Sequence, residues 1–505
     1  MSELPVSIAE YYHERTKYDP QTIAAKNKSL DWENQPSPFK EYKIGNTFDL
    51  KPYLSSQVSS SSDANLVMGK RLSQLLAYSY GLTAKVPTMG IPLYLRSAPS
   101  AGGLYPAELY LISRGTPFLP PGLYNYQPQS HSLIHFWEND VWQDLQSACL
   151  WHSALDNTQV ALVTTAIFYR SAWRYEDRAY RRIFLDTGHL LGNIELASAI
   201  VDYRPHLIGG FLDQAMNDLL YLDWQVESVM TVIPLADLLD IKQHLSPGIT
   251  ALPSGTQRNY PKLADGDLLT YFHQATEIHT SELAISKETQ IEDKYNFPFC
   301  LKVPTQMYPI SWGDKLSGLE TTILKRRSTR AYSGAEIRLD ELKALLNFTY
   351  QPQNYIAQNL DPAPDYFDLD LLQTFIAVSG VAGLEEGCYY YAPKSQELRQ
   401  IRFKNFRREL HYLCLGQELG RDAAAVVFHT ADLGKAVNRY GDRAYRYLHL
   451  DAGHLGQRLN LAAIYLDLGV SGIGGFFDDQ VNEVLGIPTD EAVIYITTLG
   501  RPRKG

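Results

Sequence analysis

Hydrophobic and polar residues follow two different periods along the chain. Apolar residues return every three or four positions in residues 340–350 and 451–469, which predicts two amphipathic helices, the second ending at Gly469. Short β-branched or apolar runs predict four buried strands, at residues 107–113, 160–169, 424–431 and 492–500. Long helices mixed with a few strands predict an α+β fold built in layers.

Much of this pattern occurs twice. The segment "RYEDRAYRRIFLDTGHLLGN" from Arg174 resembles "RYGDRAYRYLHLDAGHLGQR" from Arg439, 265 positions later, and the same shift aligns residues 208–211 with residues 473–476. We therefore predict two related halves, 1–245 and 246–505, joined through a segment rich in Pro, Gly and Ser. Two copies of one domain usually pack about an approximate two-fold axis, so we expect an intramolecular pseudo-dimer.

The composition excludes several classes of protein. The chain has 505 residues, 45% of them hydrophobic and 20% charged, so it can bury large cores. Its net charge of -10 argues against general nucleic-acid binding. No apolar run reaches membrane-spanning length and the N-terminus lacks a signal-peptide core, so we expect no membrane association and a cytoplasmic location. The four cysteines form no CxxC pair, which favours reduced thiols and no metal site.

Two motifs have the chemistry to bind a ligand, and each occurs in one half only. The loop "RSAPSAGGLYP", residues 96–106, offers backbone N–H groups with little side chain in the way, which suits a flat or anionic ligand. The run "RRSTR", residues 326–330, places three guanidinium groups beside a hydroxyl, which suits a phosphate. A solvated basic turn is the alternative for the second motif, and an exposed tail is the alternative for the basic C-terminal "LGRPR".

In their order and spacing these motifs resemble the nitroreductase superfamily of FMN flavoproteins, and more closely its SagB-type branch, which includes thiazole and oxazole dehydrogenases. The resemblance implies an α+β dimer fold with FMN at the interface. It implies that the phosphate is bound by Arg326, Arg327, Ser328, Arg330, Arg501 and Arg503. It implies that the flavin ring lies against Gly474 and Gly475, with Pro99, Ser100, Ala101 and Gly102 supplied by the other half.

The two halves have lost complementary parts of such a site. Shifted by 265, the loop falls on residues 363–371, which bring Asp365, Phe367 and Asp368 in place of Ser100 and the glycines. Shifted by 270, the basic run falls on residues 56–60. Shifted by 265, the C-terminal cluster falls on residues 234–238, and neither segment contains an arginine. We therefore predict one composite FMN site, with the pseudo-equivalent place empty or filled by side chains. The alternative is independent drift of two inactive domains.

The resemblance also indicates a catalytic pair. Azoline dehydrogenases of this branch have a Lys-Tyr pair that acts in proton removal, and here the pair reads Arg174-Tyr175 in the first half. Arginine keeps its proton at ordinary pH, which disfavours azoline oxidation. Tyr175 can still transfer a proton, and Arg174 can stabilise a negative charge. The alternative for Arg174 is a salt bridge with a nearby acid such as Glu176.

We therefore predict an FMN-dependent oxidoreductase of the nitroreductase type, with one flavin between the halves and a small-molecule or peptide substrate. Reduced nicotinamide is a candidate electron donor, and an intramolecular pseudo-dimer can act as a monomer. One alternative is an azoline (thiazoline or oxazoline) peptide dehydrogenase. The other is a protein that binds flavin or peptide without turnover.

Overall fold

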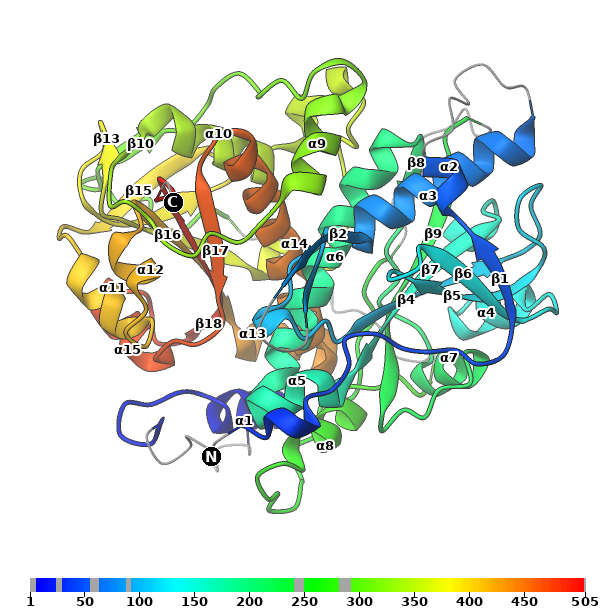
Figure 1. Cartoon of the computed structure of the whole chain (residues 1–505). Coiled ribbons are helices and arrows are strands. Elements are labelled where there is room, and N and C mark those ends of the chain that lie inside the picture. The colour runs from blue at the N-terminus through cyan, green and yellow to red at the C-terminus, as the bar shows by residue number, and fades with distance from the viewer. Residues whose placement is uncertain are drawn as a thin grey trace.

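The computed structural model describes residues 6–23, 30–54, 63–87, 92–239, 249–280 and 292–503. Each half contains a seven-stranded antiparallel sheet, and the two sheets have the same strand order (Figure 1). The first sheet is ordered β1 (Asn46–Asp49), β6 (Ser132–Trp137), β5 (Gly122–Gln127), β4 (Ala107–Ser113), β7 (Val160–Ile167), β9 (Glu227–Asp237) and β8 (Tyr203–Pro205). The second is ordered β10 (Lys302–Pro304), β15 (Glu397–Arg402), β14 (Gly387–Ala392), β12 (Gln373–Val378), β16 (Ala425–Asp432), β18 (Glu491–Gly500) and β17 (Gly469–Ile473). The α+β fold and the duplication are thus confirmed.

Two short ladders and a set of helices complete the halves. The ladders are β2 (Leu82–Val86) with β3 (Leu93–Arg96), antiparallel, and β11 (Ile337–Arg338) with β13 (Val381–Ala382), parallel. The helices of the first half are α1 (Ile8–Arg15), α2 (Lys51–Leu54), α3 (Ala64–Tyr80), α4 (Trp142–Ala148), α5 (Phe168–Tyr175), α6 (Ala179–Ile200) and α7 (Asp213–Leu219). Those of the second are α8 (Leu268–Ala275), α9 (Ser317–Lys325), α10 (Leu339–Tyr350), α11 (Arg407–Leu413), α12 (Glu418–Asp422), α13 (Leu433–Tyr440), α14 (Ala444–Tyr465) and α15 (Asp478–Leu485).

The predicted elements are present, although the helix predicted from residue 451 begins at Ala444 and two other ends differ by more than one residue. The predicted strand 160–169 ends at Ile167, because Phe168 begins α5. The second predicted helix is α14, which ends at Tyr465, and Gly469 begins β17 instead of ending the helix. Glycine is required at position 469 for another reason, since a Cβ there would lie 2.8 Å from the Thr329 hydroxyl.

Helices α6 and α14 cross at the centre of the molecule, between the two sheets (Figure 1). Each has 22 residues and is buried on nearly every face, as expected for a helix enclosed by protein. They touch backbone to backbone at Gly188 and Gly453, which are 265 positions apart. A Cβ on either glycine would lie 2.3 Å from a carbonyl oxygen of the other helix.

Two reciprocal clusters of buried ion pairs join the halves. In one cluster, two arginines at the N-terminal end of α6 bind an aspartate at the start of α15. In the other, two arginines at the equivalent positions before and in α14 bind an aspartate at the start of α7. The four pairs, 2.7 to 2.9 Å long, are Arg178–Asp478, Arg181–Asp478, Arg443–Asp213 and Arg446–Asp213. This exchange of partners is what a two-fold interface produces.

The N-terminal helix of each half packs on the other half. The rings of Tyr12 in α1 and Phe272 in α8 stack 4.4 Å apart between them. The Ala9 N–H donates to Asp442 of the second half (3.2 Å), and the Leu269 N–H donates to Asp177 of the first (3.0 Å). The predicted boundary between residues 245 and 246 falls outside the described residues. The exchanged helices nevertheless tie the two halves into one folded unit.

A candidate site between the two halves

The predicted flavin-binding loop of the first half is held on the central helix α6. Asp186 in α6 accepts hydrogen bonds from the Ser100 hydroxyl (2.6 Å) and from the Ala101 N–H (3.1 Å). The Ser100 hydroxyl in turn accepts from the Tyr105 N–H (2.9 Å). Gly102 has φ +66°, a conformation that favours glycine. Burial raises the pKa of Asp186 to about 7, although these hydrogen bonds act in the opposite direction.

Arg326 of the second half reaches across to the base of this loop. Its guanidinium donates from Nε to the Ser97 carbonyl (2.6 Å) and from Nη2 to the Arg96 carbonyl (3.0 Å). Its Nη1 is buried and has no hydrogen-bond partner among the described residues. Burial lowers the pKa of Arg326 to about 10, because a buried cation is poorly solvated. A buried donor left unpaired on a cation is what an anionic ligand would satisfy.

The residues after Arg326 lie beside strand β17. The Thr329 N–H donates to the Val470 carbonyl (2.8 Å), which fixes the segment against the strand. Within the described part of the chain, Ser328 and the exposed Arg330 make no hydrogen bond or ion pair, so both are open to a ligand. Arg327 instead donates to the hydroxyl (3.0 Å) and carbonyl (3.1 Å) of Thr83 and so links the two halves.

The C-terminal arginines are placed differently. Arg501 forms an ion pair with Glu341 (2.7 Å), which neutralises its charge. The first half has a corresponding ion pair, Arg71–Asp237 (2.7 Å), in which the acidic and the basic residue have exchanged positions. Arg503 is exposed, and its backbone N–H donates to the Ala331 carbonyl. A phosphate-binding role for Arg501 or Arg503 stays a prediction, and the pairing of Arg501 weighs against it.

The Gly-Gly turns of the two halves differ in their hydrogen bonds. In the first half, the N–H groups of Gly209 and Gly210 both donate to the Thr250 carbonyl, at 2.7 and 3.3 Å. In the second half, the N–H groups of Gly474 and Gly475 donate to no acceptor among the described residues. The turn predicted to face the flavin ring therefore has two open backbone donors.

Tyr175 and Arg182 connect the loop of the first half to the Gly-Gly turn of the second. The Arg182 guanidinium carbon lies 3.7 Å from the centre of the Tyr175 ring. A Cβ on Gly102 would lie 2.9 Å from the Tyr175 hydroxyl, and a Cβ on Gly474 would lie 2.1 Å from Arg182 Nη1. Arg174 is exposed, with its guanidinium carbon 5.7 Å from the same ring. Predicted residues from both halves thus meet here.

Arg182 was not among the predicted site residues. Its equivalent in the second half is Tyr447, so a basic residue present in one copy only was the available signal. The site prediction followed glycines and clustered arginines, and Arg182 lies inside a helical motif whose other arginines have structural ion pairs.

The place that corresponds to the candidate site by the internal repeat is filled by side chains. Asp451 accepts from the N–H groups of Phe367 (3.0 Å) and Asp368 (2.8 Å), as Asp186 does from its own loop. The Phe367 ring stacks on Tyr447, with centroids 5.0 Å apart, and occupies the space over Gly209. These contacts favour the prediction that this place is filled by side chains, which stays a prediction.

Three further contacts complete this filling. The Asp368 carboxylate binds Arg439 (3.1 Å), and Leu252 from the join between the halves covers the second glycine of the turn. Asp365, expected near the ligand position, pairs instead with Arg204 (2.9 Å). The predicted counterpart of the basic run, residues 56–60, lies outside the described residues.

The buried arginines separate into two groups. Twelve arginines of the described chain are buried, and nine of them bind a carboxylate: Arg71, Arg170, Arg178, Arg181, Arg204, Arg399, Arg443, Arg446 and Arg458. The three that bind none are Arg96, Arg182 and Arg326. Arg182 and Arg326 lie at the candidate site, whereas the Arg96 guanidinium lies among the rings of Phe39, Tyr80 and Tyr105. Buried charge without a counter-ion is costly, so Arg182 and Arg326 are the two candidates for binding an anion.

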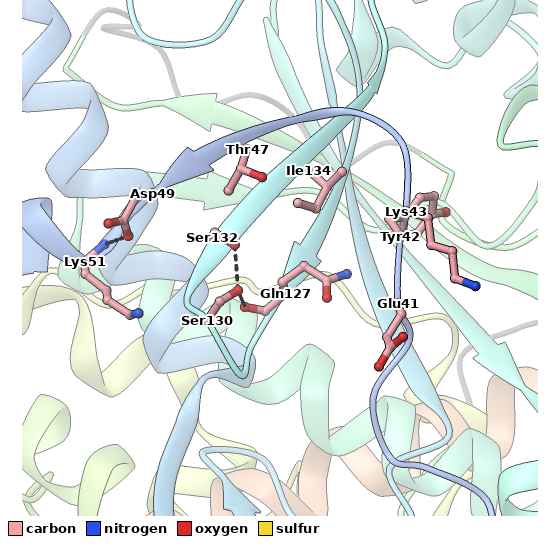
Figure 2. Close-up of a pocket in the computed structure, with 10 residues that line it drawn as sticks. All are labelled: Glu41, Tyr42, Lys43, Thr47, Asp49, Lys51, Gln127, Ser130, Ser132 and Ile134. Carbon is pink, nitrogen blue, oxygen red and sulfur yellow. Dashed lines mark hydrogen bonds between the residues drawn. The ribbon is translucent and has the colours of Figure 1, made fainter.

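Two cavities lie elsewhere. One, of about 490 Å³, opens between the segment around Tyr42 and strands β1 and β6, at the outer edge of the first sheet (Figure 2). Its wall mixes charges of both signs, and none of the predicted site residues lines it. The other, of about 510 Å³, lies between Trp137 and Tyr221. Among the described residues no His, Cys, Asp and Glu cluster could hold a metal ion, and no helix is long and apolar enough to cross a membrane.

Comparison with known proteins identifies the family. The nitroreductase family matches residues 65–235 and 323–501, one segment in each half and together more than half of the chain. The chain belongs to the nitroreductase family. It is an oxidoreductase of this family, which agrees with the resemblance found in the sequence and with a flavin cofactor.

Three relatives show how far the similarity extends. A crystal structure of a "putative nitroreductase" from Anabaena variabilis is 71% identical, has a TM-score of 0.94, and covers 98% of this chain and 100% of its own. The "Putative nitroreductase MJ1384" of Methanocaldococcus jannaschii is 31% identical over 34% of this chain and 84% of its own length. The "Microcin B17-processing protein McbC" of Escherichia coli is 28% identical over 29% of this chain, and the match spans 56% of McbC.

Proposed function

We propose that this member of the nitroreductase family is an FMN-dependent oxidoreductase with one flavin bound between its two halves. The observation that carries the proposal is the position of Arg182 and Arg326, two buried arginines without carboxylate partners. Arg326 of the second half lies at the base of the first-half loop, and Arg182 of the first half lies beside the Gly-Gly turn of the second. A phosphate dianion and an electron-accepting ring are the ligand groups that this charge suits.

The residues present fit the two ends of FMN. Arg326 Nη1, Ser328 and Arg330 would hold the phosphate, because all three have unused donors at the junction of the halves. The open N–H groups of Gly474 and Gly475 would bind acceptor atoms of the ring. The residue 99–102 loop, fixed by Asp186, would form the wall from the first half. FMN bound in this way supplies the hydride-transfer chemistry.

Tyr175 is the proton-transferring residue in this proposal. Its hydroxyl lies against Gly102, where a side chain would clash with it, and two guanidinium groups lie near its ring. The corresponding Tyr440 shares Asp368 with Arg439 and is therefore engaged by a residue of its own half. Arg174 is exposed beside Tyr175 and is placed to contact a substrate.

A peptide substrate is the second candidate. One relative, McbC, is named for processing microcin B17, and another is the "Trifolitoxin operon protein TfxC" of Rhizobium leguminosarum. An aromatic pair lies next to Arg174: the rings of the exposed Trp32 and the half-buried Trp173 meet edge to face, with centroids 5.5 Å apart. Azoline oxidation would still need a base other than Arg174. Turnover of a thiazoline-containing peptide, measured by mass loss of two hydrogens, would favour this candidate over small-molecule reduction.

The decisive experiment is cofactor analysis of the purified protein. We expect a flavin absorption spectrum, FMN as the released cofactor by mass spectrometry, and a ratio near one flavin per chain. Bleaching of the flavin by reduced nicotinamide in stopped flow would show redox competence. Bound FAD as the only flavin, or a ratio near two, would refute the proposal.

A further inference from the structure

Arg182 is the one arginine at the N-terminal end of α6 without a carboxylate partner. It is 8% exposed, its Nε is buried without a hydrogen-bond partner, and its guanidinium forms no ion pair or hydrogen bond with any described residue. Arg178 and Arg181, in the preceding turn, both bind Asp478. One carboxylate of the second half thus pairs with two of these arginines, and the third has no such partner.

Asp186 interacts with the charge of Arg182 but is a weak counter-ion. Asp186 lies one turn further along α6, but its carboxyl already accepts hydrogen bonds from Ser100 and Ala101. Burial raises the pKa of Asp186 to about 7, so this carboxyl is only partly charged near neutral pH. The Tyr175 ring covers one face of the guanidinium and leaves the N–H groups at its edge free to donate.

Tyr447, the counterpart of Arg182 in the second half, has hydrogen-bond partners for its polar group. The Tyr447 hydroxyl donates to the Leu252 carbonyl (2.7 Å) and accepts from Arg443 Nε (3.1 Å). Tyr447, which is neutral and hydrogen-bonded, thus lies in the place that is filled by side chains. Arg182, a cation without an ion pair, lies beside the Gly474-Gly475 turn, whose N–H groups are unpaired among the described residues.

We propose that Arg182 binds a planar anion beside Gly474 and Gly475, at the ring end of the site and apart from the phosphate group. The proposal rests on the proposed function and adds a preference for an anionic group at the ring end of the site. The anion is either a carboxylate of the substrate or the negative charge of the reduced flavin ring. Both are flat, delocalised anions that a guanidinium edge matches with two parallel hydrogen bonds.

Two nitroaromatic probes separate these sources. 4-Nitrobenzoate and 4-nitrobenzyl alcohol share the ring and the nitro group and differ in the carboxylate. If the substrate supplies the anion, Arg182→Met raises KM for 4-nitrobenzoate about tenfold or more and leaves KM for the alcohol unchanged. Arg182→Lys restores part of the loss. Arg421→Met, at an exposed arginine paired with Asp422, is the matched control and leaves both KM values unchanged.

The second experiment measures the midpoint potential of the bound flavin. If the reduced ring supplies the anion, Arg182→Met lowers the midpoint potential of bound FMN, by about 30 mV for a tenfold change in the two-electron equilibrium. The rates at which the enzyme reduces the two probes then fall equally. Arg182→Tyr copies the residue found at position 447 and should behave like Arg182→Met. An unchanged potential together with unchanged KM values in Arg182→Met would overturn the proposal.

A third measurement separates this proposal from the flavin proposal. Arg182→Met should raise the melting temperature of the flavin-free protein, because it removes an uncompensated buried charge. If the substrate supplies the anion, the flavin-free protein titrated with 4-nitrobenzoate by calorimetry should lose binding on that substitution, even if FMN proves not to be the cofactor. A lower melting temperature in Arg182→Met, with anion binding and flavin potential both unchanged, would show a structural role instead.

Discussion

The loop around Gly102 and the loop around Asp368 share an anchor and differ in what they expose. Each is held by an aspartate of a central helix, Asp186 or Asp451, through backbone N–H groups at 2.8 to 3.1 Å. Gly102 has no side chain and so admits the Tyr175 hydroxyl, whereas the Asp368 carboxylate binds the arginine next to the second tyrosine. The duplicated backbone is present on both sides. In the proposed function, a few side chains decide which side takes the ligand.

The largest effect should come from making the first loop resemble the second. Gly102→Asp places a carboxylate in front of Tyr175 at a residue whose φ is +66°, so it adds strain, bulk and negative charge together. We expect no measurable FMN binding by fluorescence titration. Gly416→Asp, at an exposed glycine with positive φ and open space around its Cβ position, controls for backbone strain. Normal FMN content in Gly102→Asp would contradict the composite site.

Removing the charge that crosses between the halves should have the next largest effect. Arg326→Met deletes the buried Nη1 donor and is expected to weaken FMN binding by about a hundredfold, the range of a charge-assisted hydrogen bond with its desolvated ion. Fluorescence titration of the flavin-free protein measures it. Arg421→Met again serves as the control, and equal affinities in the two variants would exclude Arg326 from the phosphate site.

The two tyrosines should differ in turnover. Tyr175→Phe is expected to lower kcat by about tenfold to a hundredfold, with FMN affinity unchanged, because it removes a proton donor from the open place. Tyr440→Phe removes a hydroxyl that interacts with Asp368 in the filled place, so its kcat should stay within a factor of about two. Steady-state kinetics with one nitroaromatic acceptor measures both. Equal losses in the two variants would contradict the assignment of catalysis to the first half.

The smallest expected effect is a change in pH dependence. Burial raises the pKa of Asp186 from 3.8 to about 7 in the folded protein, so its stabilising contribution is complete below about pH 4 and is lost as pH rises through 7. Between about pH 5 and pH 7, the wild-type free energy of unfolding should fall by about 2 kcal/mol relative to Asp186→Asn. Denaturant titrations at both pH values measure the difference. Asp451, whose pKa is also raised to about 7, is common to both proteins and cancels.

The sequence predicted the features that are written in local patterns. The repeat of 265 positions, the strands around Leu109 and Val427, and the loop with its glycines all follow from residue order. The complementary loss of loop and arginines also follows, since it requires only an alignment of the two halves. These features supported the fold, the family and the position of the candidate site.

The rest depends on contacts between residues far apart in the chain. Nothing near Arg501 indicates that Glu341 neutralises it, and nothing near Arg182 indicates that it alone on its helix lacks a carboxylate. The role of the join was also hidden, because Thr250 and Leu252 look like ordinary linker residues. Only the folded structure shows that this segment covers the Gly-Gly turn of the first half and not that of the second.

The exchange of helices α1 and α8 between the halves has a consequence for how the protein behaves at low concentration. In a dimer of separate chains, a site shared by two subunits is lost whenever dilution drives the subunits apart. Here both walls belong to one covalent chain, so each sees the other at a fixed and high effective concentration. The integrity of the site is therefore independent of how many copies of the protein the solution contains.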